Sequence, residues 1–73
     1  MLPPLRAKLM GTIIEPGASQ AMIGLPGGRV EFRSQGELLG PQDEGAVISR
    51  IGPASIEVAR GDERTELKIE RQF

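Results

Sequence analysis

The chain has 73 residues, with no cysteine, histidine, tryptophan or tyrosine and only two phenylalanines. Nine basic residues oppose ten acidic ones, and the net charge of −1 disfavours non-specific nucleic-acid binding, whose affinity comes mainly from neutralised phosphates. Without cysteine or histidine the chain has no disulfide, no Cys/His zinc site and no imidazole general base. We therefore expect one small domain over residues 1–73, stabilised by an aliphatic core alone.

Ten glycines and six prolines divide the chain into short segments, and none shows the apolar spacing of a helix over three turns. Apolar and polar residues alternate instead, which indicates strands. We predict strands at residues 5–14, 20–25, 29–33, 46–51, 55–59 and 64–69, and a short extended piece at 37–39. This spacing of strands and turns is typical of a small all-β sandwich or barrel. No apolar run approaches the roughly 20 residues of a membrane span, and no signal-peptide apolar region is present.

The first strand is apolar on both of its predicted faces. Side chains of a strand alternate between faces, so KLMGTII at residues 8–14 divides into two sets. One set is Leu9, Gly11 and Ile13, and the other is Met10, Thr12 and Ile14. Two explanations stay open: the strand is covered on both sides by its own chain, or a partner completes its second face or free edge. Gly11 in mid-strand marks a close backbone approach or a bend.

The motif PGG at residues 26–28 predicts a turn between the second and third strands. If Leu25 pairs with Val30 across this turn, Ile23 pairs with Phe32, and both pairs share one face. We therefore expect Val30 and Phe32 to face the core. The side chains expected to face water are Arg29, Glu31 and Arg33.

The last two strands predict a second hairpin, with the Gly-Asp of RGDE (60–63) at its centre. Glycine at the first central position suits a type II′ turn. This turn places Val58 opposite Thr65 and Ile56 opposite Leu67, with both pairs on one face. The opposite face is expected to hold Glu57, Glu66 and Lys68.

Residues that resemble catalytic groups have simpler explanations. The acidic pairs Asp43/Glu44 and Asp62/Glu63 lie in glycine-containing turns, where we expect solvated carboxylates rather than an acid–base pair. The serines have no histidine to activate them, and no nucleophile-elbow pattern is present. We therefore expect a non-enzyme with no catalytic residue, no metal and no cofactor.

Two loops resemble known binding motifs. RGD at residues 60–62 matches an integrin-binding tripeptide, but the hairpin turn by itself explains Gly-Asp there. GLPGGR at residues 24–29 is glycine-rich like a phosphate-binding loop, yet it lacks the Lys-Ser/Thr ending and precedes a strand rather than a helix. We interpret both loops as hairpin connections.

The order of the segments resembles the homology region of type II secretion system protein C, which links the inner-membrane platform to the outer-membrane secretin. The resemblance covers residues 5–69 and depends on an ordered set of motifs rather than on one specific motif. These motifs are LRAKLMGTI, SQAMIG, GGRVEFRSQGELLG and AVISRIGPASIEVARGDERTELKI.

The resemblance implies a small β-sandwich or barrel-like pair of three-stranded antiparallel sheets, in the periplasmic part of an inner-membrane-anchored protein. That family's membrane helix and C-terminal PDZ or coiled-coil region are absent from this chain, and contacts with other inner-membrane components are expected through those segments. The expected partner is the secretin's N-terminal periplasmic domain, with no nucleic acid, cofactor or direct membrane contact. The expected partner-binding residues are Met10, Gly11, Thr12, Ile13, Ile14 and Glu15.

Two other interpretations stay open. The pilus assembly protein P family resembles the same pattern, including GELLG at residues 36–40, and likewise contacts a secretin. A small-barrel nucleic-acid binder of the cold-shock or SH3-like kind would need aromatic stacking residues and a basic groove. The balanced charge and the expected burial of Phe32 disfavour this last interpretation.

Overall fold

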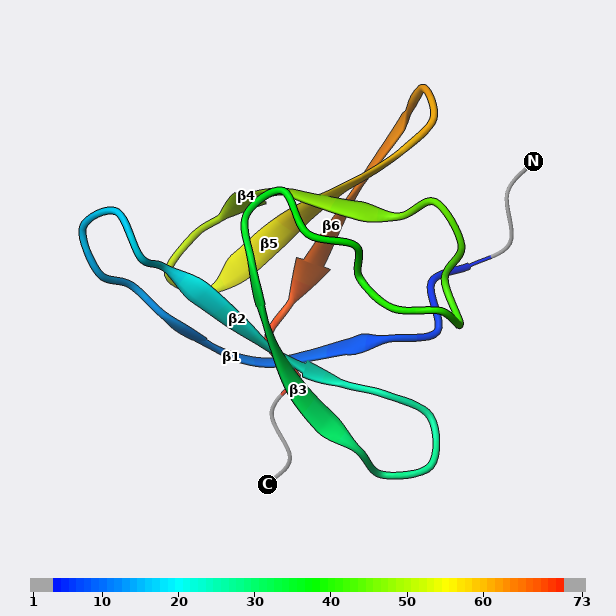
Figure 1. The fold of residues 1–73 in the computed structure, drawn as a ribbon, viewed down its shortest axis with the longest axis horizontal. Helices are drawn as coiled ribbons and strands as arrows, with labels where there is room; N and C mark the ends of the chain where they lie inside the picture. Colours follow the sequence, from blue (N-terminus) through cyan, green and yellow to red (C-terminus); the bar gives the residue numbers. More distant parts are fainter. Residues whose placement is uncertain (1–3, 71–73) are drawn as a thin grey trace.

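The computed structural model describes residues 4–70, and the predicted all-β fold is confirmed there (Figure 1). Six strands form two antiparallel sheets, ordered β1-β2-β3 and β4-β5-β6. Their bounds are β1 Lys8–Ile13, β2 Gln20–Gly24, β3 Val30–Ser34, β4 Val47–Ile51, β5 Ser55–Arg60 and β6 Glu63–Lys68. Within residues 4–70 no helix is long and apolar enough to cross a membrane.

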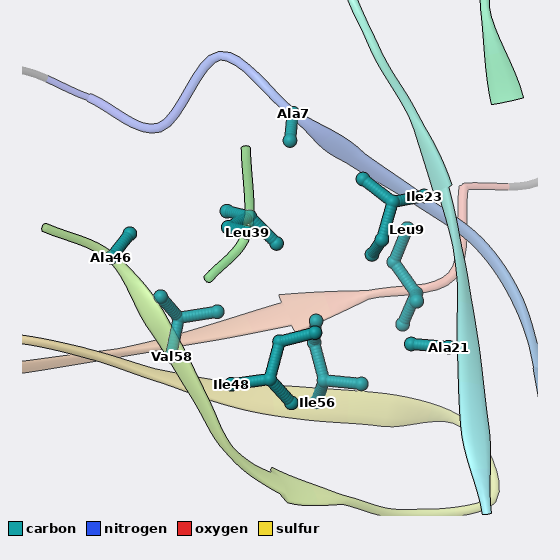
Figure 2. Close-up of a cluster of buried hydrophobic side chains, with 9 residues drawn as sticks. All are labelled: Ala7, Leu9, Ala21, Ile23, Leu39, Ala46, Ile48, Ile56 and Val58. Carbon is teal, nitrogen blue, oxygen red and sulfur yellow. The ribbon is translucent and has the colours of Figure 1, made fainter. Parts of the chain in front are cut away.

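The core lies between the two sheets and is aliphatic throughout (Figure 2). Its nine buried side chains are Ala7, Leu9, Ala21, Ile23, Leu39, Ala46, Ile48, Ile56 and Val58. Both sheets and the loop after β3 contribute to it, so the fold depends on contacts between segments distant in sequence. Phe32 is not part of this core and is half-exposed.

The two sheets join at two corners of the sandwich. At one corner the N–H of Glu70 donates to the carbonyl of Leu9 (3.0 Å), and Ile69 forms a parallel bridge with Leu9. At the other corner the segment 36–39 runs antiparallel to β4, with the Leu39 N–H donating to the Ala46 carbonyl (2.8 Å). The extended piece predicted at 37–39 is therefore confirmed, and it covers one edge of β4.

The hairpin between β5 and β6 has the predicted register. Val58 pairs with Thr65 and Ile56 with Leu67. Gly61 has a φ of 61°, and no non-glycine residue among those described has a positive φ. Positive φ at the first central position alone is the type II′ pattern, so the interpretation of this Gly-Asp pair as a turn is confirmed.

The predicted register between β2 and β3 is wrong by one residue. Met22 pairs with Phe32 and Gly24 with Val30, so Val30 and Phe32 point away from the core. The difference arises in the turn: the N–H of Leu25 donates to the Arg29 carbonyl (2.7 Å), so Leu25 lies opposite Arg29 rather than Val30, with residues 26–28 between them. The glycines at 27 and 28 both have positive φ, which permits this turn. A shift of one residue exchanges the two faces of a strand, because side chains alternate.

A bulge in β1 changes which residues share a face. Leu9 pairs with Ile23 and Gly11 with Met22, so Met10 is an extra residue without a partner in the ladder. The bulge ends the simple alternation predicted for this strand. Leu9 and Thr12 point to the core side, and the outward residues are Met10, Gly11 and Ile13.

The prediction that Asp43 is solvated is wrong, because this residue is buried. Its carboxylate accepts the backbone N–H groups of Arg6 (2.7 Å) and Ala7 (2.9 Å) and the side-chain amide of Gln42 (3.1 Å). These bonds hold the segment before β1 against the loop after β3. The sequence pattern missed this role because the two partners lie 36 and 37 residues away. By contrast, Asp62 and Glu63 are exposed, as predicted.

We expect Asp43→Asn to lower the free energy of unfolding by about 1–3 kcal/mol, because one of two buried backbone N–H groups loses its acceptor. Urea unfolding measures the change. The matched control is Glu44→Gln at the exposed neighbouring position, expected to stay within about 0.5 kcal/mol of the parent. Equal stability of the two variants would show that Asp43 does not hold the N-terminal segment.

The observed register also predicts which apolar side chains matter for stability. Ile23 is fully buried, so Ile23→Ala should cost about 2–5 kcal/mol. Phe32 is half-exposed, so Phe32→Ala should cost at most about 1 kcal/mol despite removing a larger side chain. Chemical denaturation measures the free energy of unfolding of both variants and so tests the register. A large decrease in this free energy for Phe32→Ala would place the ring in the core and contradict the register.

Candidate functional site

The outer face of the first sheet has large apolar side chains on all three of its strands. The pairing register places five large side chains on the side opposite the core, and we call this set the apolar face. Its members are Met10, Ile13, Met22, Val30 and Phe32. Val30 and Phe32 are each 50% exposed. Because β2 and β3 supply three of the five members, the face exists only once the sheet has formed.

The outer face of the second sheet shows what an ordinary solvated face of this domain looks like. Its register gathers charged and hydroxyl side chains, namely Arg50, Ser55, Glu57, Arg64, Glu66 and Lys68. Ser55 Oγ donates to Glu66 Oε2 (3.0 Å), and Ser49 Oγ donates to Glu57 Oε1 (2.9 Å). The first outer face also has Lys8, Gln20 and Ser34, and the second also has Val47 and Ala59, but the large apolar side chains gather on the first face and the charged ones on the second. Exposed apolar side chains gathered on one side mark a surface suited to binding.

Two methionines lie across two glycines on the apolar face. The Cε atom of Met22 is 3.4 Å from the position that a Cβ on Gly11 would occupy. In the same way, Sδ of Met10 is 3.1 Å from a Cβ position on Gly24. The glycines thus let long, flexible thioether side chains lie flat on the sheet. Methionine adapts its shape to a contacting surface, which suits a face that another molecule covers.

Charged side chains occupy the free edge of the first sheet, along β3. Glu31 forms ion pairs with Arg33 and, at 2.6 Å, with Arg29. The hydrogen bond from Arg33 holds the pKa of Glu31 below its ordinary value, and the positive charges of Arg33 and Arg29 act in the same direction. Charged residues on an edge strand, including ones that point inward, disfavour the addition of a further strand. The face of this sheet is therefore better suited to contact than the edge at β3.

The edge of β1 is partly covered by the chain itself. The bridge from Leu9 to Ile69 occupies its beginning, and within residues 4–70 no other strand pairs with this edge beyond Leu9. Thr12 is directed to the second sheet, where its Oγ1 donates to the carbonyl of Pro53 (3.0 Å). One face of the first strand is buried and the other is open, so residues 4–70 do not cover the strand on both sides; its completion by a partner stays a prediction.

The sequence-predicted partner-binding residues divide into three groups. Met10, Gly11 and Ile13 lie on the apolar face, and Thr12 lies on the other side of the sheet. The remaining two, Ile14 and Glu15, are exposed beyond the end of β1. The prediction that Met10, Thr12 and Ile14 share a face is wrong, because the bulge interrupts their alternation.

Sequence reasoning missed the contributions of β2 and β3 to this face. Met22 stands between the buried residues Ala21 and Ile23, so β2 is apolar on both faces, as β1 is. A second strand with two apolar faces was a signal in the sequence that could have located the site. Val30 and Phe32 gave no such signal, because a one-residue difference in the turn decides where they point.

No group of three or more acidic side chains among the described residues is arranged to hold a metal ion. In comparisons with known proteins, the chain matched no family model, no curated protein and no solved structure. The site is therefore described by its geometry alone: an open apolar sheet face on a small β-sandwich.

The ion pairs at the β3 edge predict a pH dependence. A pKa lowered by folding means that Glu31 stabilises the fold above its unfolded value, near 4.5, and that this stabilisation is lost as the pH falls through the folded value. We expect Glu31→Gln to show a flatter dependence of unfolding free energy on pH below about 4.5. An NMR titration should find the Glu31 pKa raised in Arg33→Gln, and an unchanged midpoint would contradict this account.

Proposed function

We propose that this domain is a non-catalytic interaction module that binds another protein through the apolar face of its first sheet. The supporting observation is the contrast between the two outer faces: five large apolar side chains on one and charged side chains on the other. The core is already filled from the inner faces of both sheets, so the apolar face does not serve the packing of residues 4–70. Covering it with a partner would remove this apolar surface from water.

The proposed partner is the N-terminal periplasmic domain of a type II secretion system secretin. In this role the domain would lie in the periplasm and link the inner-membrane platform to the outer-membrane secretin, with other inner-membrane components bound through segments outside this chain. The resemblance to protein C of that system supports this proposal. The motifs LRAKLMGTI, SQAMIG and GGRVEF, which contribute to that resemblance, supply the three strands of the apolar face.

A second candidate partner is the secretin of a type IV pilus, as for the pilus assembly protein P family. The motif GELLG favours it, since Leu38 in this motif is 61% exposed and lies beside an open hollow of about 520 Å³. An apolar side chain so exposed offers a second contact point, away from the apolar face.

One observation supports a nucleic-acid partner: Phe32 is half-exposed, whereas the sequence predicted that it would be buried. Single-stranded nucleic acids stack on exposed aromatic rings within a basic groove. However, the other four members of the apolar face are aliphatic or methionine, and the net charge is −1. The surface therefore favours a protein partner. Filter binding to single-stranded DNA at low salt distinguishes the two kinds of partner, since retention of the DNA would favour a nucleic acid.

Phe32→Asp tests the proposed function, because it places a charge on the apolar face without emptying the core. We expect the affinity for the isolated secretin domain to fall at least about 30-fold, as at a binding hot spot of 2 kcal/mol or more. Isothermal titration calorimetry measures the affinity. The matched control is Gln35→Asp, which adds the same charge at an exposed position after β3.

Circular dichroism confirms that both variants are folded before binding is compared. Unchanged affinity in folded Phe32→Asp would contradict docking through this face. Binding of the pilus secretin domain in preference to the type II domain would instead select the second candidate partner.

A further inference from the structure

One end of the apolar face is hollowed, beside the beginning of β1 and the turn between β2 and β3. This turn projects at the lower right of Figure 1. The hollow has a volume of about 320 Å³. Its apolar and glycine lining residues are Met10, Gly24, Leu25, Pro26, Gly28 and Val30. Two of these, Met10 and Val30, belong to the apolar face, so the hollow continues that surface.

Three basic residues also line the hollow, and among the described residues no acidic residue lines it. They are Arg6, Lys8 and Arg29. A cluster of like charges around an apolar floor is favourable only if an anion or solvent screens it. The hollow therefore differs from the chain as a whole, in which nine basic residues oppose ten acidic ones.

The chain neutralises these cations only in part. Lys8 Nζ is 3.8 Å from Glu70 Oε2, and both side chains are more than half exposed, so this pair is weak. Arg29 shares the single carboxylate of Glu31 with Arg33. Within residues 4–70 the side chain of Arg6 forms no ion pair.

The backbone at this end of the sheet is held in place. The N–H of Arg6 donates to the buried carboxylate of Asp43 at 2.7 Å, which fixes the segment that presents Arg6 and Lys8. On the other side, the N–H of Leu25 donates to the Arg29 carbonyl and the N–H of Gly28 to the Leu25 carbonyl, and these bonds close the turn that contains Arg29. The basic residues therefore belong to two anchored segments on either side of one apolar floor.

We propose that this hollow binds carboxylate groups that flank an apolar segment of the protein partner, an inference that rests on the docking function proposed above. Arginine suits this role because its planar guanidinium donates two parallel hydrogen bonds to one carboxylate. The apolar part of the segment would lie along Met10, Val30 and Phe32, and its acidic end would lie among the cations. The charges thereby set the direction in which the partner lies on the sheet.

An anionic membrane surface would also attract cations beside apolar residues. Membrane-binding clusters usually contain four to eight basic residues, whereas this hollow has three and the chain has a net charge of −1. Glu31 also lies beside Arg29, and it would repel a dense array of phosphates. These charges favour a segment with one or two carboxylates over an extended anionic surface.

Two synthetic peptides test the inference by NMR titration of the complete domain. One has two glutamates followed by alternating valine and threonine, and the other has two glutamines in place of the glutamates. We expect both to shift the amide signals of Gly24 and Val30, with the glutamate peptide binding about fivefold more tightly at low salt, as for exposed ion pairs. High salt should abolish the difference.

The double variant Arg6→Gln/Arg29→Gln should lose this preference for glutamate, and it keeps the Arg6 backbone N–H that Asp43 accepts. Its matched control, Arg50→Gln/Lys68→Gln, removes two charges from the other sheet and should keep the preference. Equal affinity for the two peptides, no shift at Gly24 and Val30, or the same loss in the control would overturn the inference.

Co-sedimentation with vesicles of mixed phosphatidylglycerol and phosphatidylcholine tests the alternative that the cations bind a membrane. Co-sedimentation that depends on Arg6 and Arg29, together with equal binding of the two peptides, would assign the cations to a membrane and overturn the inference. Because the docking function is judged by Phe32→Asp and the secretin domain, it can stand when the cation inference fails.

Discussion

A strand in a two-layer sandwich has only two faces, so the addition of one residue decides whether a side chain is buried or exposed. The register of this domain shifts by one residue at two places in its first sheet. In the turn between β2 and β3, Leu25 lies opposite Arg29 rather than Val30, and β1 has Met10 as an extra residue. The turn directs Val30 and Phe32 outward, and the bulge directs Gly11 and Ile13 outward, to the side where Met10 lies. The apolar face follows from these two local events.

The core tolerates this arrangement because it is complete without the outward residues. Ile23 and Leu9 form a cross-strand pair in the first sheet, and Ile48, Ile56 and Val58 face them from the second. The small side chains of alanines in the cluster let the sheets approach closely. A large ring such as Phe32 is not needed inside, so it remains available on the surface.

Asp43 links this packing to the candidate site. With no disulfide to hold the ends, the chain relies on a buried carboxylate to fix the segment before β1 against a loop about 36 residues away. The bonded N–H groups belong to Arg6 and Ala7, one of which bears a cation of the hollow and the other a core side chain. A single polar contact therefore positions part of the core and part of the proposed carboxylate-binding end together.

The sequence alone determined the fold class, because alternation and turn residues are local properties. It predicted the six strands, the extended piece at 37–39 and the register of the β5–β6 hairpin, whose Gly-Asp turn leaves little choice of geometry. It also indicated that the first strand has surplus apolar surface. The same surplus indicates Met10, which lies on the apolar face.

Only the tertiary structure decided which residues join Met10. The bulge in β1, the shifted pairing across the turn before β3 and the burial of Asp43 depend on how distant segments pack, and no local pattern encodes that balance. Leu25 illustrates the reason: it packs partly against the core in either register, so its apolar character does not indicate whether Arg29 or Val30 lies opposite it. The alternation of side chains along a strand defines its two faces, but the packing of the whole chain determines which face is exposed to solvent.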